Sequence, residues 1–272
     1  EDYLRFLRQD SHEVEALFRE LLIGVTNFFR DPESFEVLKN EVLPNIMGTL
    51  KDDSTFRVWV PGCSSGEEAY SLAMVIRECQ DDLSKRITLQ IFGTDIDRQA
   101  IERAREGLYP SSIQADVSQE RLQRFFYKEG DGFRIRKQIR ETMVFSVQDV
   151  LKDPPFSRLN LLCCRNLMIY LNPDAQKKLL PLFHYTLVPQ GILMLGSSET
   201  VGGFTNLFHY LNSSWKIYQR REVPDSMRER IEFPTGSPGK RPEESETGPS
   251  PARQRGDLEK LTRDLLQQRF AP

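Results

Sequence analysis

The sequence predicts an α/β fold built on a doubly wound, mostly parallel sheet. From residue 56 onward, short apolar runs alternate with segments of helical periodicity, and most of the loops between them are short. Polar residues or glycines follow the ends of several runs. The predicted strands are residues 56–60, 87–93, 143–147, 159–164, 191–196 and 215–220. The predicted helices between them cover residues 66–79, 97–106 and 173–187.

The first of these strands enters a turn that contains two glycines, Gly62 and Gly66. Glycine lets the backbone approach a ligand, and the carboxyl ends of the strands face the crevice of such a sheet. The spacing matches neither GxGxxG nor a P-loop, because no lysine follows Gly66. Glu67 and Glu68 open the next helix, where carboxylates disfavour a phosphate and accept a cation. The turn predicts a pocket for a positively charged ligand; an ordinary strand-to-helix turn is the alternative.

The composition is that of an ordinary globular chain. The net charge of −3 over 272 residues gives no reason to expect a nucleic-acid partner. No apolar run approaches the roughly 18 residues of a membrane span, so no membrane insertion is expected. The four cysteines lack CxxC spacing and the three histidines are scattered. We therefore predict reduced, buried thiols, a cytoplasmic location and no metal site.

Residues 1–47 are predicted to form an N-terminal helical segment. Its first apolar face repeats at spacings of three and four residues and consists of Val14, Leu17, Phe18, Leu21 and Leu22. A second helix is predicted to begin at Pro32, with Asp31 as its N-cap. Leu43-Pro44 is predicted to end that helix.

A small antiparallel β-subdomain is predicted at about residues 121–147. Phe133-Arg134-Ile135-Arg136 follows a glycine turn and alternates apolar with basic side chains, which is typical of a hairpin. Residues 121–141 hold seven Lys or Arg against three acids. This is a local basic patch on an acidic chain; a solvated hairpin face is the alternative interpretation.

The C-terminal part of the chain has a different composition. Residues 222–256 are rich in Pro, Gly, Ser, Glu and Arg, which predicts a disordered linker. Residues 257–272 then carry an amphipathic pattern whose apolar positions are Leu258, Leu261, Leu265, Leu266 and Phe270. A helix this short is marginal alone, so we expect it to pack on this domain, pair with a partner or lead into a further domain.

Polar side chains follow three of the predicted strands. They are Asp95, Asp149 and the pair Arg165-Asn166. In a doubly wound sheet the ligand lies beyond the carboxyl ends of the strands, and an acidic residue there can accept from two ribose hydroxyls. Each of these residues alone is equally compatible with a helix cap. Their convergence on one edge of one sheet predicts a binding site.

Four motifs in this order resemble the CheR-type chemotaxis receptor methyltransferases. They are TNFFRD (26–31), VWVPGCSSGEEAYSLA (58–73), FGTDID (92–97) and CRNLMIYL (164–171). The resemblance covers about residues 10–220 and implies a Rossmann-like S-adenosylmethionine methyltransferase domain at 48–221. It implies methyl transfer from S-adenosylmethionine to glutamate side chains of chemoreceptor signalling helices, giving γ-methyl esters and S-adenosylhomocysteine.

The resemblance also assigns roles to individual residues. It implies that Asp95 binds the ribose and that Glu68 binds the methionine end or a nearby hydroxyl. Asp149 and Val150 stand where the family frames the adenine. The residues that it implies as the remaining binding shell are Thr26, Arg30, Arg165 and Asn166, with Gly62 and Gly66 as the floor beneath the sulfonium. Arg30 and Tyr170 are implied to lie closest to the transferred methyl group.

Further expectations concern partners. The opening helices and the sequence LEKLTRDLLQQRFAP resemble fusions in which the CheR unit follows a CheB-type methylesterase and precedes PAS-type sensory domains. The hairpin tip is shorter than in members that grip a receptor tail, so we predict no dependence on a tail pentapeptide. Two alternatives stay open: a regulatory module that binds the cofactor without turnover, and a methyltransferase acting on RNA or a small molecule.

Overall fold

The computed structural model describes residues 26–223 together with Tyr3, Phe6, Asp10, Glu13 and Gly24. The predicted apolar face between Val14 and Leu22 lies outside the described residues, as do the C-terminal helix and nearly all of the predicted linker. All the described residues belong to one unit, Glu1–Gly236.

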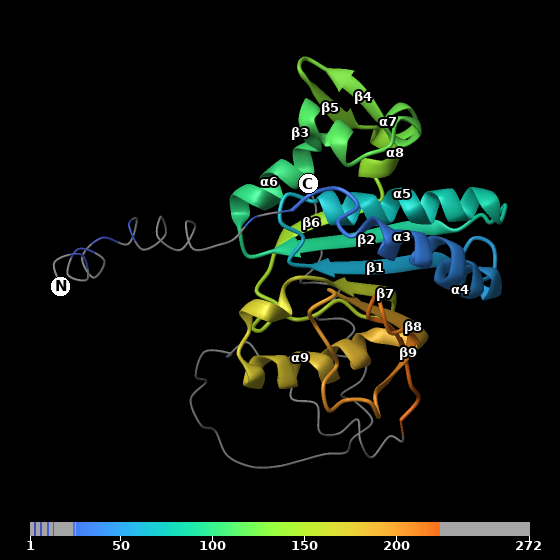
Figure 1. Ribbon diagram of the computed structural model, residues 1–272, viewed down its shortest axis with the longest axis vertical. Helices are drawn as coiled ribbons and strands as arrows, with labels where there is room; N and C mark the ends of the chain where they lie inside the picture. The colour runs from blue at the N-terminus through green and yellow to red at the C-terminus, as the bar shows by residue number, and fades with distance from the viewer. Residues whose placement is uncertain are drawn as a thin grey trace, which may run out of the picture. The chain divides into compact units, whose positions relative to one another are not determined.

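A seven-stranded sheet lies at the centre of this unit (Figure 1). The order is β6-β2-β1-β7-β8-β10-β9. The first five strands pair in parallel, and β10 pairs antiparallel with both of its neighbours, β8 and β9. Its strands are β1 (Thr55–Pro61), β2 (Thr88–Asp95), β6 (Met143–Val147), β7 (Leu159–Cys164), β8 (Leu187–Leu195), β9 (Phe208–Asn212) and β10 (Ile217–Arg220). The predicted mostly parallel sheet is confirmed.

Helices cover both faces of this sheet. The α-helices are α3 (Pro32–Val37), α4 (Leu43–Thr49), α5 (Glu67–Asp82), α6 (Arg98–Glu106), α7 (Gln119–Phe125), α8 (Lys137–Arg140) and α9 (Pro173–Thr186). Short 3-10 turns lie at η2 (Ser111–Ala115) and η3 (Met168–Tyr170). No helix among the residues that the structure describes is long and apolar enough to cross a membrane.

Successive strand residues point into two separate cores. Val58 and Ile91 pack in the core that includes α5, whereas their neighbours Trp59 and Phe92 pack in the core that includes α9. Figure 1 shows α5 and α9 on opposite sides of the strands. Because both faces are covered, the central strands are almost continuously apolar, and the polar groups available for a ligand concentrate at the strand ends.

The helix that begins at Pro32 differs from the prediction in two ways. Asp31 precedes it, but its side chain caps no helix amide and accepts from Arg165 instead. Pro44 does not end the helix. A π-helical turn, η1 (Leu38–Val42), connects α3 to α4. Proline lacks the N–H for a normal α-helical bond, and a wider turn just before it accommodates that loss without breaking the helix.

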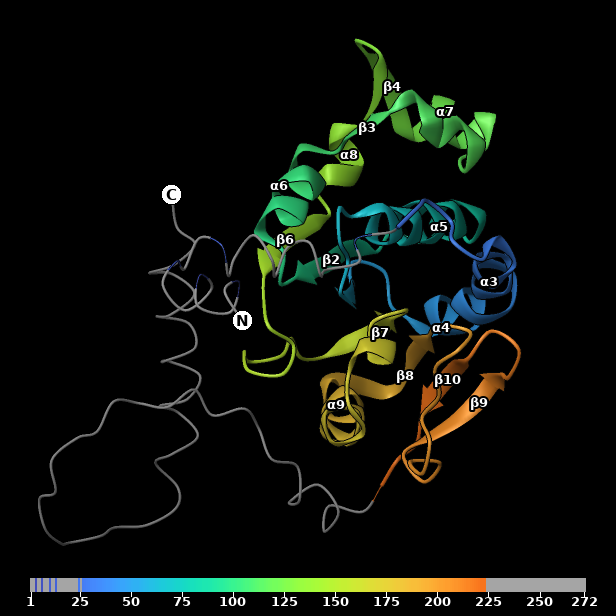
Figure 2. The same ribbon diagram turned by 60° about the vertical axis from the view of Figure 1, so that its left-hand side comes forward.

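The predicted hairpin is confirmed, but the predicted extent of its subdomain is wrong. Strands β4 (Phe126–Glu129) and β5 (Gly132–Ile135) pair antiparallel, and β3 (Leu108–Pro110) completes this small sheet (Figures 1 and 2). The β6 segment pairs with β2 of the large sheet instead. The pairing of β6 with β2 places it in the large sheet, and its position next to the hairpin in the sequence does not reveal that pairing.

Acidic neighbours neutralise much of the basic patch at 121–141. Arg121 pairs with Glu78, and the three other paired cations are Arg124 with Asp81, Arg134 with Glu129 and Lys137 with Glu141. Four of the seven cations therefore have acidic partners. This pairing favours the interpretation of the patch as a solvated face.

Candidate functional site

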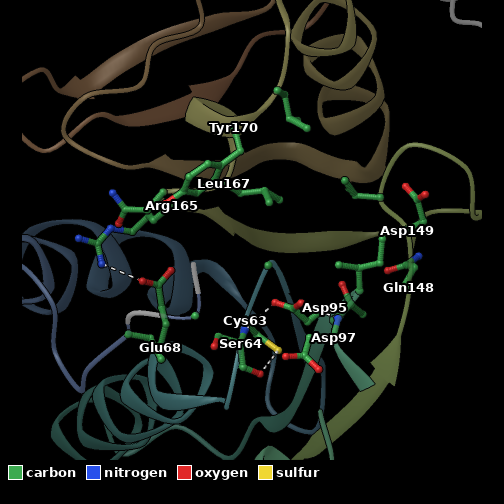
Figure 3. A pocket seen from close by; sticks show the side chains of 18 of the residues that line it. Cys63, Ser64, Glu68, Asp95, Asp97, Gln148, Asp149, Arg165, Leu167 and Tyr170 are labelled. Carbon is green, nitrogen blue, oxygen red and sulfur yellow. Dashed lines mark hydrogen bonds and ion pairs between the residues drawn. The ribbon is translucent and has the colours of Figure 1, made fainter. Parts of the chain in front are cut away.

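A pocket of about 450 Å³ lies beyond the carboxyl ends of β1, β2, β6 and β7. This is the edge at which a doubly wound sheet places its ligand. Among the predicted site residues, those that line it are Thr26, Arg30, Gly62, Glu68, Asp95, Asp149, Val150, Arg165, Asn166 and Tyr170. Figure 3 shows the Glu68–Arg165 pair apart from the cluster formed by Asp95, Asp97 and Ser64.

The two glycines of the β1–α5 turn have different roles. Gly62 has a φ of 70°, and a Cβ there would lie 3.2 Å from the side chain of Leu167 on the pocket wall. Gly66 has a φ of 95° and does not line the pocket; a Cβ there would lie 2.9 Å from Ala104. The expected contact of Gly66 with a ligand is therefore replaced by a packing role, because α5 begins there against α6.

Asp95 ends β2 and uses each carboxylate oxygen once within the protein. Its Oδ2 accepts from the backbone N–H of Ser64 at 2.8 Å, and its Oδ1 accepts from that of Asp97 at 2.9 Å. A carboxylate has about four acceptor positions, so acceptor capacity remains for a diol. Burial raises the pKa of Asp95, although the backbone hydrogen bonds oppose that shift.

Asp149 and Val150 follow β6 and line the pocket. Figure 3 shows Asp149 on the same side of the pocket as Asp95. The Asp149 carboxylate accepts from the backbone N–H of Leu151 at 3.0 Å and pairs with Lys152 at 2.9 Å. Its own N–H donates to Asp153 at 2.8 Å. These local bonds fix a turn after β6, and the carboxylate is partly committed to that turn.

Glu68 and Arg165 form a largely buried ion pair at the other side of the pocket. Arg165 donates to Glu68 at 3.0 Å. The Arg165 side chain is 1% exposed and the Glu68 side chain is 13% exposed. The thiol of Cys163 donates to the other Glu68 oxygen at 3.1 Å. Burial raises the pKa of Glu68, and the neighbouring guanidinium counteracts that shift. Arg165 therefore acts chiefly as an internal support for Glu68.

The same guanidinium holds the loop that carries Arg30. It donates to the backbone carbonyl of Arg30 at 2.9 Å and to Asp31 at 2.5 Å. Phe29 and Asp31 both have left-handed φ values, 51° and 58°, and the Phe29 N–H donates to Ser71 at 3.0 Å. Non-glycine residues adopt such a conformation only when their surroundings impose it, at about 1–3 kcal/mol each. The loop is thus held in one defined shape.

Tyr170 lines the same pocket at the end of the turn η3, and the residue is 57% exposed. Asn166, in the segment between β7 and η3, has a left-handed φ of 55°. Its backbone N–H and that of Met168 both donate to Glu199, at 3.0 and 2.7 Å. Tyr170 is therefore an exposed side chain on an anchored turn.

Several residues of the site escaped the sequence reasoning. The lining also includes Ser64, Ile96, Gln148, Leu167 and Leu171, which adjoin predicted residues in the sequence. Extending each motif by one or two positions would have found them. Glu199 is different: it follows β8, and its carboxylate is buried beneath the turn that carries Tyr170. No local pattern identifies it.

Comparison with known proteins agrees with this geometry. Residues 24–217 match the family described as CheR methyltransferase, SAM binding domain. A Rhodobacter capsulatus protein, "Uncharacterized 104.1 kDa protein in hypE 3'region", is 41% identical over 80% of this chain and 23% of its own length. The chain thus spans under a quarter of that relative.

Two further relatives match over most of their own length. "Putative methyltransferase Cher3" of Pseudomonas putida is 34% identical over 75% of this chain and 76% of the relative. "Chemotaxis protein methyltransferase 1" of Pseudomonas aeruginosa is 32% identical over 76% of this chain and 77% of the relative.

The residues of the pocket fit the cofactor S-adenosylmethionine. The volume lies in the range of small-molecule sites, and Asp95 keeps acceptor capacity that suits a ribose diol. Glu68 offers a buried carboxylate for a cation, and Gly62 leaves the space that a side chain would fill. With 194 consecutive positions from 24 to 217 matched, this chain belongs to the CheR methyltransferase family and carries its S-adenosylmethionine-binding domain.

Proposed function

We propose that this domain transfers the methyl group of S-adenosylmethionine to glutamate side chains on the signalling helices of a chemoreceptor, giving γ-methyl esters. One observation carries the proposal: Arg30 and Tyr170, from segments far apart in the sequence, line the same pocket as Asp95 and Glu68. The name "Chemotaxis protein methyltransferase 1", printed for the Pseudomonas aeruginosa relative, supports the substrate class.

The chemistry asks little of the protein beyond alignment. When bound, the cofactor supplies a sulfonium methyl group that is already a strong electrophile. A glutamate is ionised at neutral pH, so no general base is required and the scattered histidines present no difficulty. Holding the two reactants in line is what remains for the protein, and such positioning is worth about 7–11 kcal/mol at most.

Arg30 and Tyr170 are the groups proposed to provide this alignment. A guanidinium presents a planar fork of donors that matches a carboxylate, so Arg30 would hold the incoming glutamate in one orientation. The Tyr170 hydroxyl can donate to that carboxylate, and its ring face can attract a cation. Asp95, Asp149 and Val150 would bind the adenosine part, and Thr26, Glu68 and Asn166 the methionine part. In this proposal Arg165 acts through Glu68 and the Arg30 loop.

Transfer to chemoreceptors is the direct test. Purified protein would be incubated with radiolabelled methyl donor and receptor-containing membranes, and the label then tested for loss in mild alkali. The proposal predicts base-labile label on the receptor. It also predicts none with Arg30→Ala and normal labelling with the matched variant Arg86→Ala, whose exposed side chain lies before β2 at the opposite end of the sheet.

The other outcomes select the alternatives. Tight cofactor binding without transfer to receptor, RNA or small molecules would indicate a regulatory binding module. Alkali-stable label on RNA or a small molecule would indicate a different acceptor. Either result would overturn the proposed substrate while leaving the family and the cofactor unchanged.

We further propose that this domain is part of a longer cytoplasmic protein with CheB-type and PAS-type domains. All four cysteines are free and buried, which agrees with a reducing compartment. We also propose independence from a receptor tail pentapeptide, because β4 and β5 are joined only by Gly130 and Asp131. Calorimetry with the pentapeptide should detect no binding at micromolar concentrations; clear micromolar binding would contradict this proposal.

A further inference from the structure

Glu199 is a buried carboxylate that the proposed chemistry does not use. It lies just after β8 and is 4% exposed. Its Oε2 accepts from the backbone N–H groups of Gly196 at 2.7 Å and Asn166 at 3.0 Å, and its Oε1 accepts from that of Met168 at 2.7 Å. Burying a charge is expensive unless hydrogen bonds compensate it, and here three backbone donors do so. The carboxylate joins two segments that follow different strands.

The fit around this carboxylate is close. A Cβ at Gly196 would lie 2.8 Å from Glu199 Oε2 and 3.0 Å from the backbone nitrogen of Asn166. Glycine is therefore what lets the β8 loop approach the β7 loop. The φ of Gly196 is not in the left-handed region, so the constraint here is space and not backbone conformation. An alanine at 196 would separate the carboxylate from its partners.

The segment that Glu199 holds is the one that presents Tyr170. Between Asn166 and Tyr170 the chain turns through η3, where the Tyr170 N–H donates to the carbonyl of Leu167 at 3.1 Å. Gln176 secures the far side by donating to the carbonyls of Met168 at 2.9 Å and Leu171 at 3.0 Å. Tyr170 is 57% exposed, so the anchored backbone beneath it is what sets the direction of its side chain.

We propose that Glu199 is a positioning residue for methyl transfer: its carboxylate fixes the backbone of residues 166–168 and thereby aims Tyr170 at the reacting groups. The inference rests on the proposed function of Tyr170. It requires a carboxylate, because both oxygens accept. A glutamine at 199 keeps the shape but turns an NH₂ group toward a backbone N–H, which removes one side of the clamp.

A double-mutant cycle tests whether Glu199 acts through Tyr170. We expect Tyr170→Phe to lower kcat by about a hundredfold and Glu199→Gln by about tenfold. If Glu199 works by aiming the Tyr170 hydroxyl, the double variant will be within about threefold of Tyr170→Phe alone, since coupled residues are not additive. Losses that multiply in the double variant would overturn the inference.

Glu78 provides the matched control. It is also a buried carboxylate, 7% exposed, and pairs with Arg121 at 2.8 Å and Lys39 at 3.0 Å. It lies ten residues beyond Glu68 on α5, about 15 Å along the helix, and outside the pocket lining. Glu78→Gln should leave kcat per folded molecule unchanged, and Glu78→Gln with Tyr170→Phe should match Tyr170→Phe.

Amide hydrogen exchange gives a readout that does not depend on turnover. In Glu199→Gln, peptides covering residues 165–171 should exchange at least about tenfold faster, while peptides from β1 and α5 keep their protection. Glu78→Gln should leave residues 165–171 unchanged. If Glu199→Gln does not fold, Gly196→Ala keeps the carboxylate, displaces it and should give the same local loss. Normal exchange at 165–171 in a folded variant would overturn the inference.

These measurements separate the two proposals. Full activity of Tyr170→Phe would remove Tyr170 from the proposed function and with it the kinetic role of Glu199. If Tyr170→Phe lowers kcat as expected but the losses in kcat multiply in the double variant, the proposed function stands and only the positioning role of Glu199 is rejected. If the wild-type protein labels no acceptor, the proposed function is rejected. The exchange experiment would still decide whether Glu199 anchors the turn that carries Tyr170.

Discussion

The side of the pocket that we propose for the adenosine part of the cofactor and the side that we propose for the methyl group, here called the adenosine side and the methyl side, are held by different kinds of interaction. On the adenosine side, Asp95 ends a central strand, and its hydrogen bonds go to the backbone of the adjoining turns. On the methyl side, Arg30 and Tyr170 lie on loops that buried charged residues support. Arg165 donates to the carbonyl of Arg30 from 135 positions away in the sequence.

This difference indicates that binding of the adenosine part of the cofactor and methyl transfer depend on separate supports. The strand ends are fixed by the sheet itself, so substitutions at the adenosine side should alter affinity and leave the rest of the site in place. The loops at the methyl side have defined shapes only because side chains hold them. Substitutions there should alter the rate of transfer more than the affinity for cofactor.

The largest expected effect is that of Arg30→Ala. Removing the guanidinium leaves the incoming carboxylate without its fork, so transfer should fall by about a thousandfold or more. The affinity for S-adenosylhomocysteine should stay within about tenfold, because the adenosine side is untouched. Steady-state labelling and calorimetry measure the two quantities, and a fully active variant would remove Arg30 from the mechanism.

Arg165→Met should damage the methyl side and the stability of the fold together. It leaves the buried Glu68 carboxylate without its cation, and breaking such a pair costs about 3–5 kcal/mol of unfolding free energy. The Arg30 loop also loses two donors. We expect urea unfolding to show a decrease of that size in the unfolding free energy. Methyl transfer by the fraction that stays folded should also be slower. The matched change Arg86→Met, at an exposed position, should alter neither quantity; an Arg165 variant of normal stability would refute the supporting role.

Asp95→Asn should have the opposite profile. The amide keeps one acceptor but loses the charge and one acceptor oxygen, so cofactor affinity should fall by about 10- to 100-fold. The turnover rate at saturating cofactor should stay within about threefold of wild type. Calorimetry and a cofactor titration of the rate supply both values. A large drop in the saturated rate would show that the two sides are not independent.

The smallest effect concerns pH. Burial raises the pKa of Glu68 above its ordinary value, so this carboxylate takes up a proton as the pH falls sooner than an exposed glutamate does. Affinity for the cationic cofactor should therefore decrease in mild acid, and Glu68→Gln should abolish that dependence. For folding the sign is reversed: because the folded state binds this proton more tightly, the contribution of Glu68 to stability rises as the pH falls. Calorimetry and urea unfolding at a series of pH values distinguish the two trends.

The sequence predicts the adenosine side better than the methyl side, for a physical reason. The strand that ends at Asp95 has its own apolar pattern, so the polar residue after it could be placed from local information. Asp31 looked like a helix cap, yet its carboxylate serves Arg165, and Gly66 packs against α6 instead of facing the ligand. Glu199 and the pairing of β3 depend on contacts across the fold, which leave no periodic trace in the sequence.

The separation of the two sides can be tested in one single-turnover experiment. Wild type, Arg30→Ala and Asp95→Asn would each be saturated with radiolabelled S-adenosylmethionine and mixed with receptor-containing membranes. We predict that Asp95→Asn transfers its methyl group within about threefold of the wild-type rate, whereas Arg30→Ala is slower by about a thousandfold or more. Slow transfer by Asp95→Asn at saturating cofactor, or fast transfer by Arg30→Ala, would contradict the separation of the two sides.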